Sequence, residues 1–163
     1  MITILVDTSF LISLADRTRA HHTVAVRYFR ESLRRDATLY LSTLVAAEFQ
    51  VKQAVTDLPL RNFVVLPFNI DHAMTAGDLV SHVQRDSEDR RDVVKEDLKI
   101  IAQAICGSIT HILTEDENTL SKYVDRVRAD RNCSVSVILL KNGFDESHFN
   151  DGQRGLIEEE PPE

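Results

Sequence analysis

The stretch VVKEDLKIIAQAI, residues 93–105, has the apolar spacing of a buried helix, yet it carries Asp97 inside its apolar stripe. Ile100 and Ala104 share the predicted face with Asp97, so this carboxylate cannot turn to solvent without exposing them. Burial of a carboxylate opposes its ionisation. The pattern therefore predicts that something near Asp97 compensates its charge.

Three further acidic residues stand at comparable positions. Glu48 shares a predicted helical face with Leu44 and Val51, which places a second carboxylate in an apolar stripe. Asp7 follows the run ITILV, and Asp116 lies just past HILT; both runs read as buried strands. The carboxyl ends of parallel strands lie at one edge of a sheet, close to the first turns of the helices that follow. We therefore expect the four acidic residues to converge at that edge.

Four clustered carboxylates point to a particular chemistry. They repel one another, and hard divalent cations that prefer oxygen ligands relieve the repulsion. None of the six histidines forms an HxxxH or HxH arrangement, and Cys106 and Cys133 lack metal-pair spacing, which argues against zinc. The expected cofactor is Mg²⁺ or Mn²⁺. Such an ion lowers the pKa of bound water and neutralises charge on a phosphodiester, so the sequence indicates phosphate ester hydrolysis.

Strands and helices alternate along the chain, which predicts βαβ units and an α/β fold with a parallel sheet. The predicted strands are 2–6, 38–41, 63–66, 110–113 and 134–140. The predicted helices begin near residue 10 and continue with 21–35, 43–55, 71–83, 93–105 and 119–128. We expect a single domain over residues 1–145, followed by an acidic tail, 146–163, that is partly disordered.

Composition narrows the class of protein. A chain of 163 residues that is 43% hydrophobic can bury a core of its own. The opening residues have no basic segment before their apolar run, and Asp7 interrupts that run, so we expect no signal peptide, no membrane span and a cytoplasmic protein. A net charge of −7 argues against coating of nucleic acid by a basic surface, but it is compatible with an enzyme that holds cations.

Four short motifs resemble the acidic motifs of PIN-domain ribonucleases, in the family's order. They are VDTSFLI with Asp7, STLVAAEF with Glu48, KEDLKIIAQAI with Asp97 and ILTED with Asp116. The resemblance covers nearly the whole chain and is nearest to the small VapC-like toxins. It implies a three-layer α/β/α sandwich with a central parallel sheet, dependence on Mg²⁺ or Mn²⁺, and endonucleolytic cleavage of RNA.

The resemblance also assigns roles to individual residues. It makes the four acidic residues both catalytic and metal-binding, with Ser9 and Thr114 as supporting hydroxyls. Glu115 and Glu117 flank Asp116, and the sequence leaves open which of the three reaches the metal. A VapC-like toxin also implies an antitoxin protein as partner and a homodimer.

Other interpretations remain open at this stage. Asp7 alone could be a helix N-cap, and Asp97 alone could form a buried ion pair with an arginine. An aspartyl phosphatase would carry DxD after the first strand, whereas residue 9 is Ser. The main alternative is a catalytically inactive PIN-like module that binds nucleic acid or protein. The candidates for contact with RNA phosphates are Arg27, Arg30, Arg34, Arg85, Arg90 and Arg91. The alternative for these arginines is a solvated surface on which they pair with neighbouring acidic residues.

Overall fold

The sheet confirms the predicted α/β class. The structure is a computed structural model that describes residues 2–131 and 133–150. Five parallel strands form one sheet in the order β3-β2-β1-β4-β5. The strands are β1 (Thr3–Val6), β2 (Thr38–Ser42), β3 (Val64–Leu66), β4 (His111–Thr114) and β5 (Ser136–Leu139).

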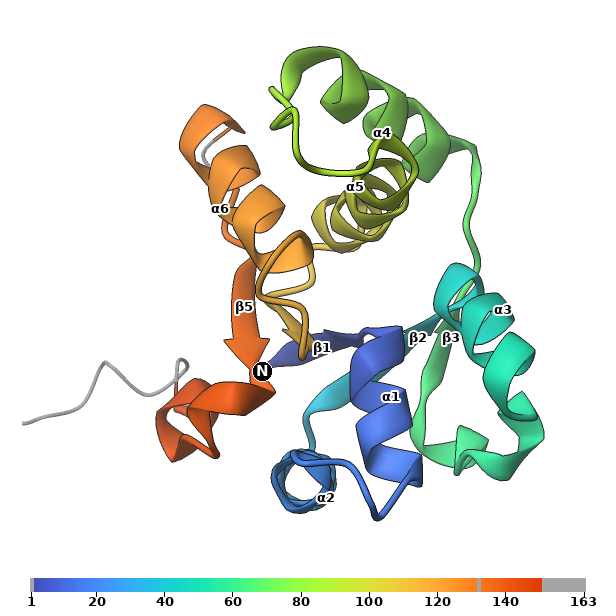
Figure 1. The fold of residues 1–163 in the computed structure, drawn as a ribbon. Helices are drawn as coiled ribbons and strands as arrows, with labels where there is room; N and C mark the ends of the chain where they lie inside the picture. The colour runs from blue at the N-terminus through green and yellow to red at the C-terminus, as the bar shows by residue number, and fades with distance from the viewer. Residues whose placement is uncertain (1, 132, 151–163) are drawn as a thin grey trace, which may run out of the picture.

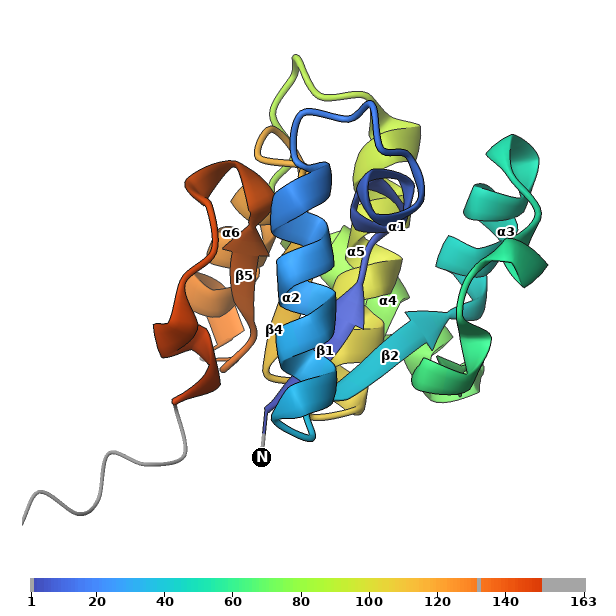
Figure 2. The same ribbon diagram turned by 90° about the horizontal axis from the view of Figure 1, so that it is seen from below.

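Helices cover both faces of this sheet, which gives the expected three layers. Figure 1 shows α4, α5 and α6 on one face and α1 and α2 on the other, and Figure 2 shows the same layers from below. The helices are α1 (Thr8–Ala15), α2 (His22–Arg34), α3 (Thr43–Lys52), α4 (Ile70–His82), α5 (Arg91–Cys106) and α6 (Leu120–Arg131). All the predicted strands and helices are present, although α3 ends at Lys52, earlier than expected, and α5 begins at Arg91.

The central strands explain why the site forms where it does. Ile4, Leu5 and Val6 of β1 are fully buried, as expected of a strand covered on both faces. In the register of the sheet, Val6 lies beside Leu41 of β2 and Leu113 of β4. The three strands therefore end together, and the residues that follow them share one edge.

The charged segment that precedes α5, residues 85–90, is fixed against α6. The backbone N–H of Asp86 donates to the Tyr123 hydroxyl at 3.1 Å, and that hydroxyl donates to the Asp89 carboxylate at 2.7 Å. Arg126 forms an ion pair of 2.7 Å with Asp86. These contacts fix the chain just before α5 and so help to position the helix that carries Asp97.

The chain after β5 packs back against α2. Glu146–Phe149 form a 3-10 helix, in which His148 Nδ1 lies 3.0 Å from the Tyr28 hydroxyl. Phe144 and Phe149 pack their rings on Tyr28. Residues 151–163, the rest of the expected tail, lie outside the described residues. In the part of the chain that is described, no helix is both long enough and apolar enough to cross a membrane.

Candidate functional site

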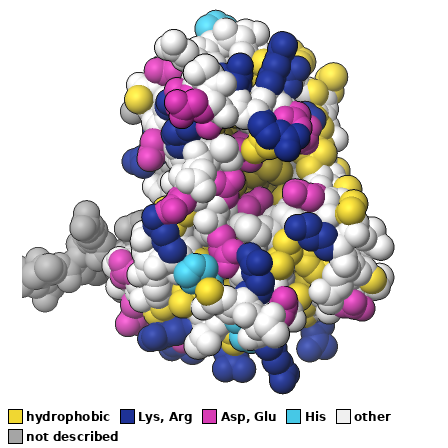
Figure 3. Space-filling model, viewed as in Figure 1, with side chains coloured by type: hydrophobic (Ala, Val, Ile, Leu, Met, Phe, Trp, Pro, Cys, Tyr) yellow, Lys and Arg dark blue, Asp and Glu magenta, His cyan; other side chains and the backbone are white. Residues whose placement is uncertain are grey.

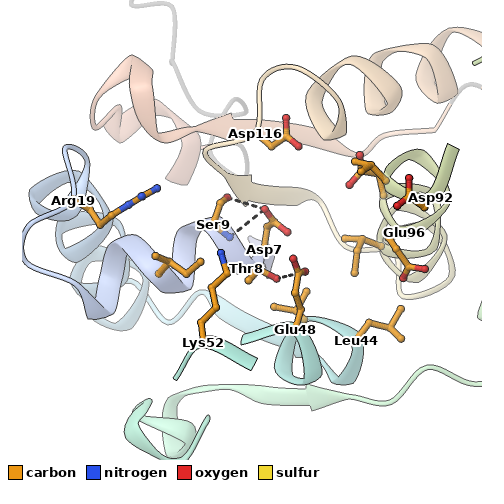
Figure 4. Close-up of a pocket in the computed structure, with 15 residues that line it drawn as sticks. Asp7, Thr8, Ser9, Arg19, Leu44, Glu48, Lys52, Asp92, Glu96 and Asp116 are labelled. Atoms are coloured by element: carbon orange, nitrogen blue, oxygen red, sulfur yellow. Dashed lines mark hydrogen bonds between the residues drawn. The ribbon is translucent and has the colours of Figure 1, made fainter. Parts of the chain in front are cut away.

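A pocket opens at the carboxyl edge of the sheet, between α1, α3 and α5. Figure 3 shows acidic side chains gathered in the hollow between α5 and α1, and Figure 4 shows the lining residues. All four predicted acidic residues line this one pocket. The polar and charged lining residues are Asp7, Thr8, Ser9, Arg19, Glu48, Lys52, Asp92, Glu96, Asp97 and Asp116. The apolar lining residues are Ile12, Leu44, Val45, Val93 and Ile100.

Asp7 directly follows β1 and is the N-cap of α1, where its side chain accepts a hydrogen bond from the Ser9 backbone N–H. The N-cap interpretation is therefore correct, and the same carboxylate also lines the pocket. Its carboxylate accepts hydrogen bonds from the Ser9 hydroxyl at 2.7 Å and from the Thr114 hydroxyl at 2.8 Å. Burial raises the pKa of Asp7 above its usual value, and the hydrogen bonds from Ser9 and Thr114 act in the opposite direction. The two hydroxyls thus support Asp7, in the positions that the sequence suggested for them.

Glu48 reaches the pocket for a different reason than predicted. The buried face of α3 consists of Val45 and Phe49, whereas Glu48 is exposed and Val51 is 86% exposed. The expected stripe through Leu44 and Val51 was therefore wrong, because the helix turns a neighbouring face toward the sheet. Glu48 instead points into the open pocket, where its carboxylate accepts a hydrogen bond of 2.6 Å from the buried Thr8 hydroxyl.

Asp97 carries the strongest sign of electrostatic strain. Its side chain is half-buried, and its Oδ2 atom is buried without a hydrogen-bond partner in the described part of the chain. Burial raises the pKa of Asp97 to about 7, a hydrogen bond to Thr119 acts against this, and the charges of Asp116, Asp7 and Glu48 raise it further. Among the described residues Asp97 forms no ion pair with an arginine, which was the alternative left open by the sequence. It lies instead among carboxylates that repel it, as predicted.

The three acidic residues directly after β4, Glu115, Asp116 and Glu117, point in different directions. Asp116 lines the pocket and accepts from the Thr119 hydroxyl at 2.6 Å. Glu115 accepts from the Ser13 hydroxyl and pairs with Arg19 at 3.0 Å. Glu117 pairs with Lys141 outside the pocket. Of the three, Asp116 is the residue that faces the other acids.

The donor set fits a hard divalent cation. Asp7, Glu48, Asp97 and Asp116 offer only carboxylate oxygens to an ion in the pocket. Oxygen is the ligand atom that Mg²⁺ and Mn²⁺ prefer. The unpartnered Oδ2 of Asp97 is an acceptor with nothing to accept from. The carboxylates do not form a closed chelate among the described residues, since no three acidic, histidine or cysteine side chains are close enough to hold an ion together. Ion binding therefore requires side-chain rotation within the pocket.

Sequence reasoning missed several residues of the pocket. Thr8 adjoins Asp7 in the first motif, and Asp92 and Glu96 precede Asp97 on α5. Arg19 and Lys52 gave no signal, because a loop residue and a helix-terminal lysine look like ordinary surface cations. The six arginines that were candidates for RNA contact do not line the pocket.

Several of those arginines have partners of their own. Arg34 pairs with Glu31, and Arg90 pairs with Asp92. Arg27 lies over the ring of Phe144, with 4.1 Å between its guanidinium carbon and the ring centroid. These contacts agree with the alternative that the sequence left open, a solvated and locally paired surface.

Comparisons with known proteins agree with this geometry. Residues 4–125 match the PIN domain family. No curated protein matches the chain. The fold is similar to that of a chain in VapBC2 from Rickettsia felis bound to a promoter DNA fragment, with a TM-score of 0.59 and 13% identity over 85% of this chain and 98% of that one.

Two further solved structures show the same likeness. One is VapBC from Salmonella typhimurium bound to DNA, with a TM-score of 0.58 and 15% identity over 86% of this chain and 99% of that one. The other is VapC20 from Mycobacterium tuberculosis, a toxin that cleaves the sarcin-ricin loop, with a TM-score of 0.55 and 20% identity over 71% of this chain and 91% of that one. Together with the family match, the order of the strands and the pocket of carboxylates at their ends, these likenesses lead to one conclusion: the chain belongs to the PIN-domain family.

Proposed function

We propose that this protein is an endoribonuclease that depends on Mg²⁺ or Mn²⁺ and hydrolyses phosphodiester bonds in RNA. The observation that carries the proposal is one pocket lined by four carboxylates from four separate segments, one of which, Asp97, has a buried Oδ2 with no hydrogen-bond partner among the described residues. A structural role would pair such a carboxylate with a cationic side chain, because an unpaired buried charge destabilises the fold.

Asp7, Glu48, Asp97 and Asp116 would hold the ion, with Ser9 and Thr114 fixing the Asp7 carboxylate. When bound, a divalent ion at this site lowers the pKa of bound water and neutralises charge on the phosphodiester. The residues of the chain do the rest. Thr8 orients Glu48 through a 2.6 Å hydrogen bond, and Thr119 orients Asp116 through another of 2.6 Å.

We further propose that the enzyme is the toxin of a toxin–antitoxin pair, acting in the cytoplasm. The support is the likeness of its fold to chains of the VapBC complexes of Rickettsia felis and Salmonella typhimurium. An antitoxin protein and a second copy of this chain are the partners that this proposal implies. Co-expression with the product of a neighbouring gene, followed by size-exclusion chromatography, tests both partners.

Cleavage of labelled RNA in Mg²⁺, Mn²⁺ and EDTA tests the central claim. We expect cleavage only with a divalent ion, and loss of cleavage on Asp97→Asn. Asp130→Asn on α6 is a matched control, because Asp130 is exposed and lies outside the pocket. A wild-type protein that binds RNA but never cuts it would instead support the inactive binding module.

A further inference from the structure

Two cationic side chains reach the carboxylate pocket from the same side. Arg19 lies in the loop between α1 and α2, and Lys52 is the last residue of α3. In Figure 4, Arg19 extends toward Ser9 and the Lys52 ammonium points toward the start of α1, whereas Asp92 and Glu96 lie across the pocket on α5. The pocket therefore has a cationic side and an acidic side.

Arg19 is held in place by a buried chain of contacts. Its Nη2 lies 3.0 Å from Oε2 of Glu115, whose side chain is only 14% exposed. The fully buried Ser13 hydroxyl donates to the other Glu115 oxygen, and the Glu115 backbone N–H donates to the Ser9 hydroxyl at 2.8 Å. Since Ser9 also donates to Asp7, the position of Arg19 is coupled to that of a proposed metal ligand.

This arrangement is unusual for a surface ion pair. An exposed pair adds little to stability, yet Glu115 is shielded, directly precedes Asp116 and is bonded from three directions. Arg19 remains 46% exposed and uses Nη2 alone on Glu115, so its other N–H donors are available to an anion in the pocket. Lys52 has no ion pair within the described part of the chain.

We propose that Arg19 and Lys52 bind RNA phosphates next to the scissile one, and that Glu115 is a positioning residue for Arg19 and not a metal ligand. The inference rests on the proposed function. A guanidinium with free N–H groups binds phosphate in a forked geometry, and an ammonium binds it as a point charge. Arg19 and Lys52 place the RNA backbone along the α1 side of the pocket. Across the pocket, Asp92 and Glu96 turn acidic groups to the lining and pair with Arg90 and Lys99, which do not line it.

Binding measurements test the two cations without any need for cleavage. On an Asp97→Asn background that keeps RNA intact, the affinity for a short labelled single-stranded RNA is measured by fluorescence anisotropy at constant Mg²⁺ and increasing KCl. The slope of log K against log salt is negative, and each lost phosphate contact makes it shallower by about 0.7 for single strands. We expect Arg19→Gln and Lys52→Gln each to show this change, with affinity reduced roughly tenfold, as for loss of a charge-assisted hydrogen bond.

Arg17→Gln is the matched control, because it removes the same charge from the same loop outside the pocket. It should leave the slope unchanged. If Arg19→Gln and Arg17→Gln give equal slopes, the assignment of Arg19 is overturned, even where the wild-type protein cleaves RNA normally. If the slopes differ as expected but the wild-type protein never cleaves RNA, the nuclease proposal fails and the phosphate contacts stand.

Glu115→Gln separates a positioning residue from a metal ligand. As a positioning residue, Glu115 affects RNA through Arg19, so the double variant with Arg19→Gln should bind RNA no more weakly than Arg19→Gln alone. The rise in melting temperature with Mg²⁺ should persist in Glu115→Gln and disappear in Asp116→Asn. Loss of that rise in Glu115→Gln would overturn the positioning role.

Discussion

Replacement of Asp97 by Asn should stabilise the metal-free protein, and more so at high pH. The pKa of Asp97 is raised by burial from 3.8 to about 7, with Asp116, Asp7 and Glu48 adding to the increase. In the unfolded chain the carboxyl ionises near its ordinary pKa. Between about pH 4 and pH 7 the unfolded state releases a proton that the folded state keeps, so this group makes the protein less stable as pH rises.

The magnitude follows from the size of the shift. A change of one pKa unit corresponds to about 1.4 kcal/mol, so the full shift would represent about 4 kcal/mol above pH 7. Solvent reaches part of the Asp97 side chain, which reduces the expected penalty to about 2–4 kcal/mol. Below about pH 4 the protonated acid and the amide are nearly isosteric and uncharged, so the difference between the two proteins should vanish there.

Urea unfolding in EDTA at pH 5 and pH 8 measures this difference. We expect the free energy of unfolding of Asp97→Asn to exceed that of the wild type by about 2 kcal/mol more at pH 8 than at pH 5. For a chain of this size that corresponds to about 4–8 °C in melting temperature. The exposed Asp130→Asn is the control and should show no such change with pH.

Two results would refute this reasoning. A loss of several kcal/mol on Asp97→Asn would show that the carboxylate is held by a buried ion pair, since removal of one partner leaves the other unpaired. A stabilisation that is the same at both pH values would show that the amide packs better for reasons unrelated to charge.

Three further outcomes are expected. Mg²⁺ or Mn²⁺ should raise the melting temperature of the wild type, because an ion at a hundredfold excess over its Kd adds about 2.7 kcal/mol to the free energy of unfolding. Scanning calorimetry should show no such rise for Asp116→Asn. Thr8→Val removes the hydrogen bond that orients Glu48 and should weaken Mg²⁺ binding by about 10–100-fold, which a thermal-shift titration measures. RNA affinity should depend on Mg²⁺, because carboxylates repel phosphates in its absence; equal, tight anisotropy curves in EDTA and Mg²⁺ would contradict this.

The layout of the fold could be predicted because its central strands are buried on both faces. ITILV at residues 2–6 and HILT at 111–114 are short apolar runs between polar residues, and alternation with helices then fixes a parallel sheet. Convergence of Asp7 and Asp116 followed from that sheet, since β1 and β4 end together. Glu48 and Asp97 followed from the helices whose N-terminal parts lie near the same edge.

The sequence predicted less well which face of a helix is buried where several of its faces are partly apolar. On α3 the sequence allows a stripe through Leu44 and Val51 or one through Val45 and Phe49, and contacts with the sheet select the second. The place of Arg19 and Lys52 in the pocket could not be predicted for another reason. Arg19 becomes distinctive only through Glu115, which lies 96 residues away in the sequence, and such a contact has no periodic signature.

The hydrogen bonding of the pocket shows which of its acidic residues most needs a cation. Asp7 is supported by two hydroxyls, Glu48 by Thr8, and Asp116 by Thr119 and backbone N–H groups. Each of these bonds stabilises a negative charge locally. Among the described residues of the pocket, only Asp97 combines a buried oxygen that lacks a donor with repulsion from its three neighbours. The folded chain therefore holds one carboxylate whose charge it does not compensate, and the free energy lost there is what a bound divalent ion can recover.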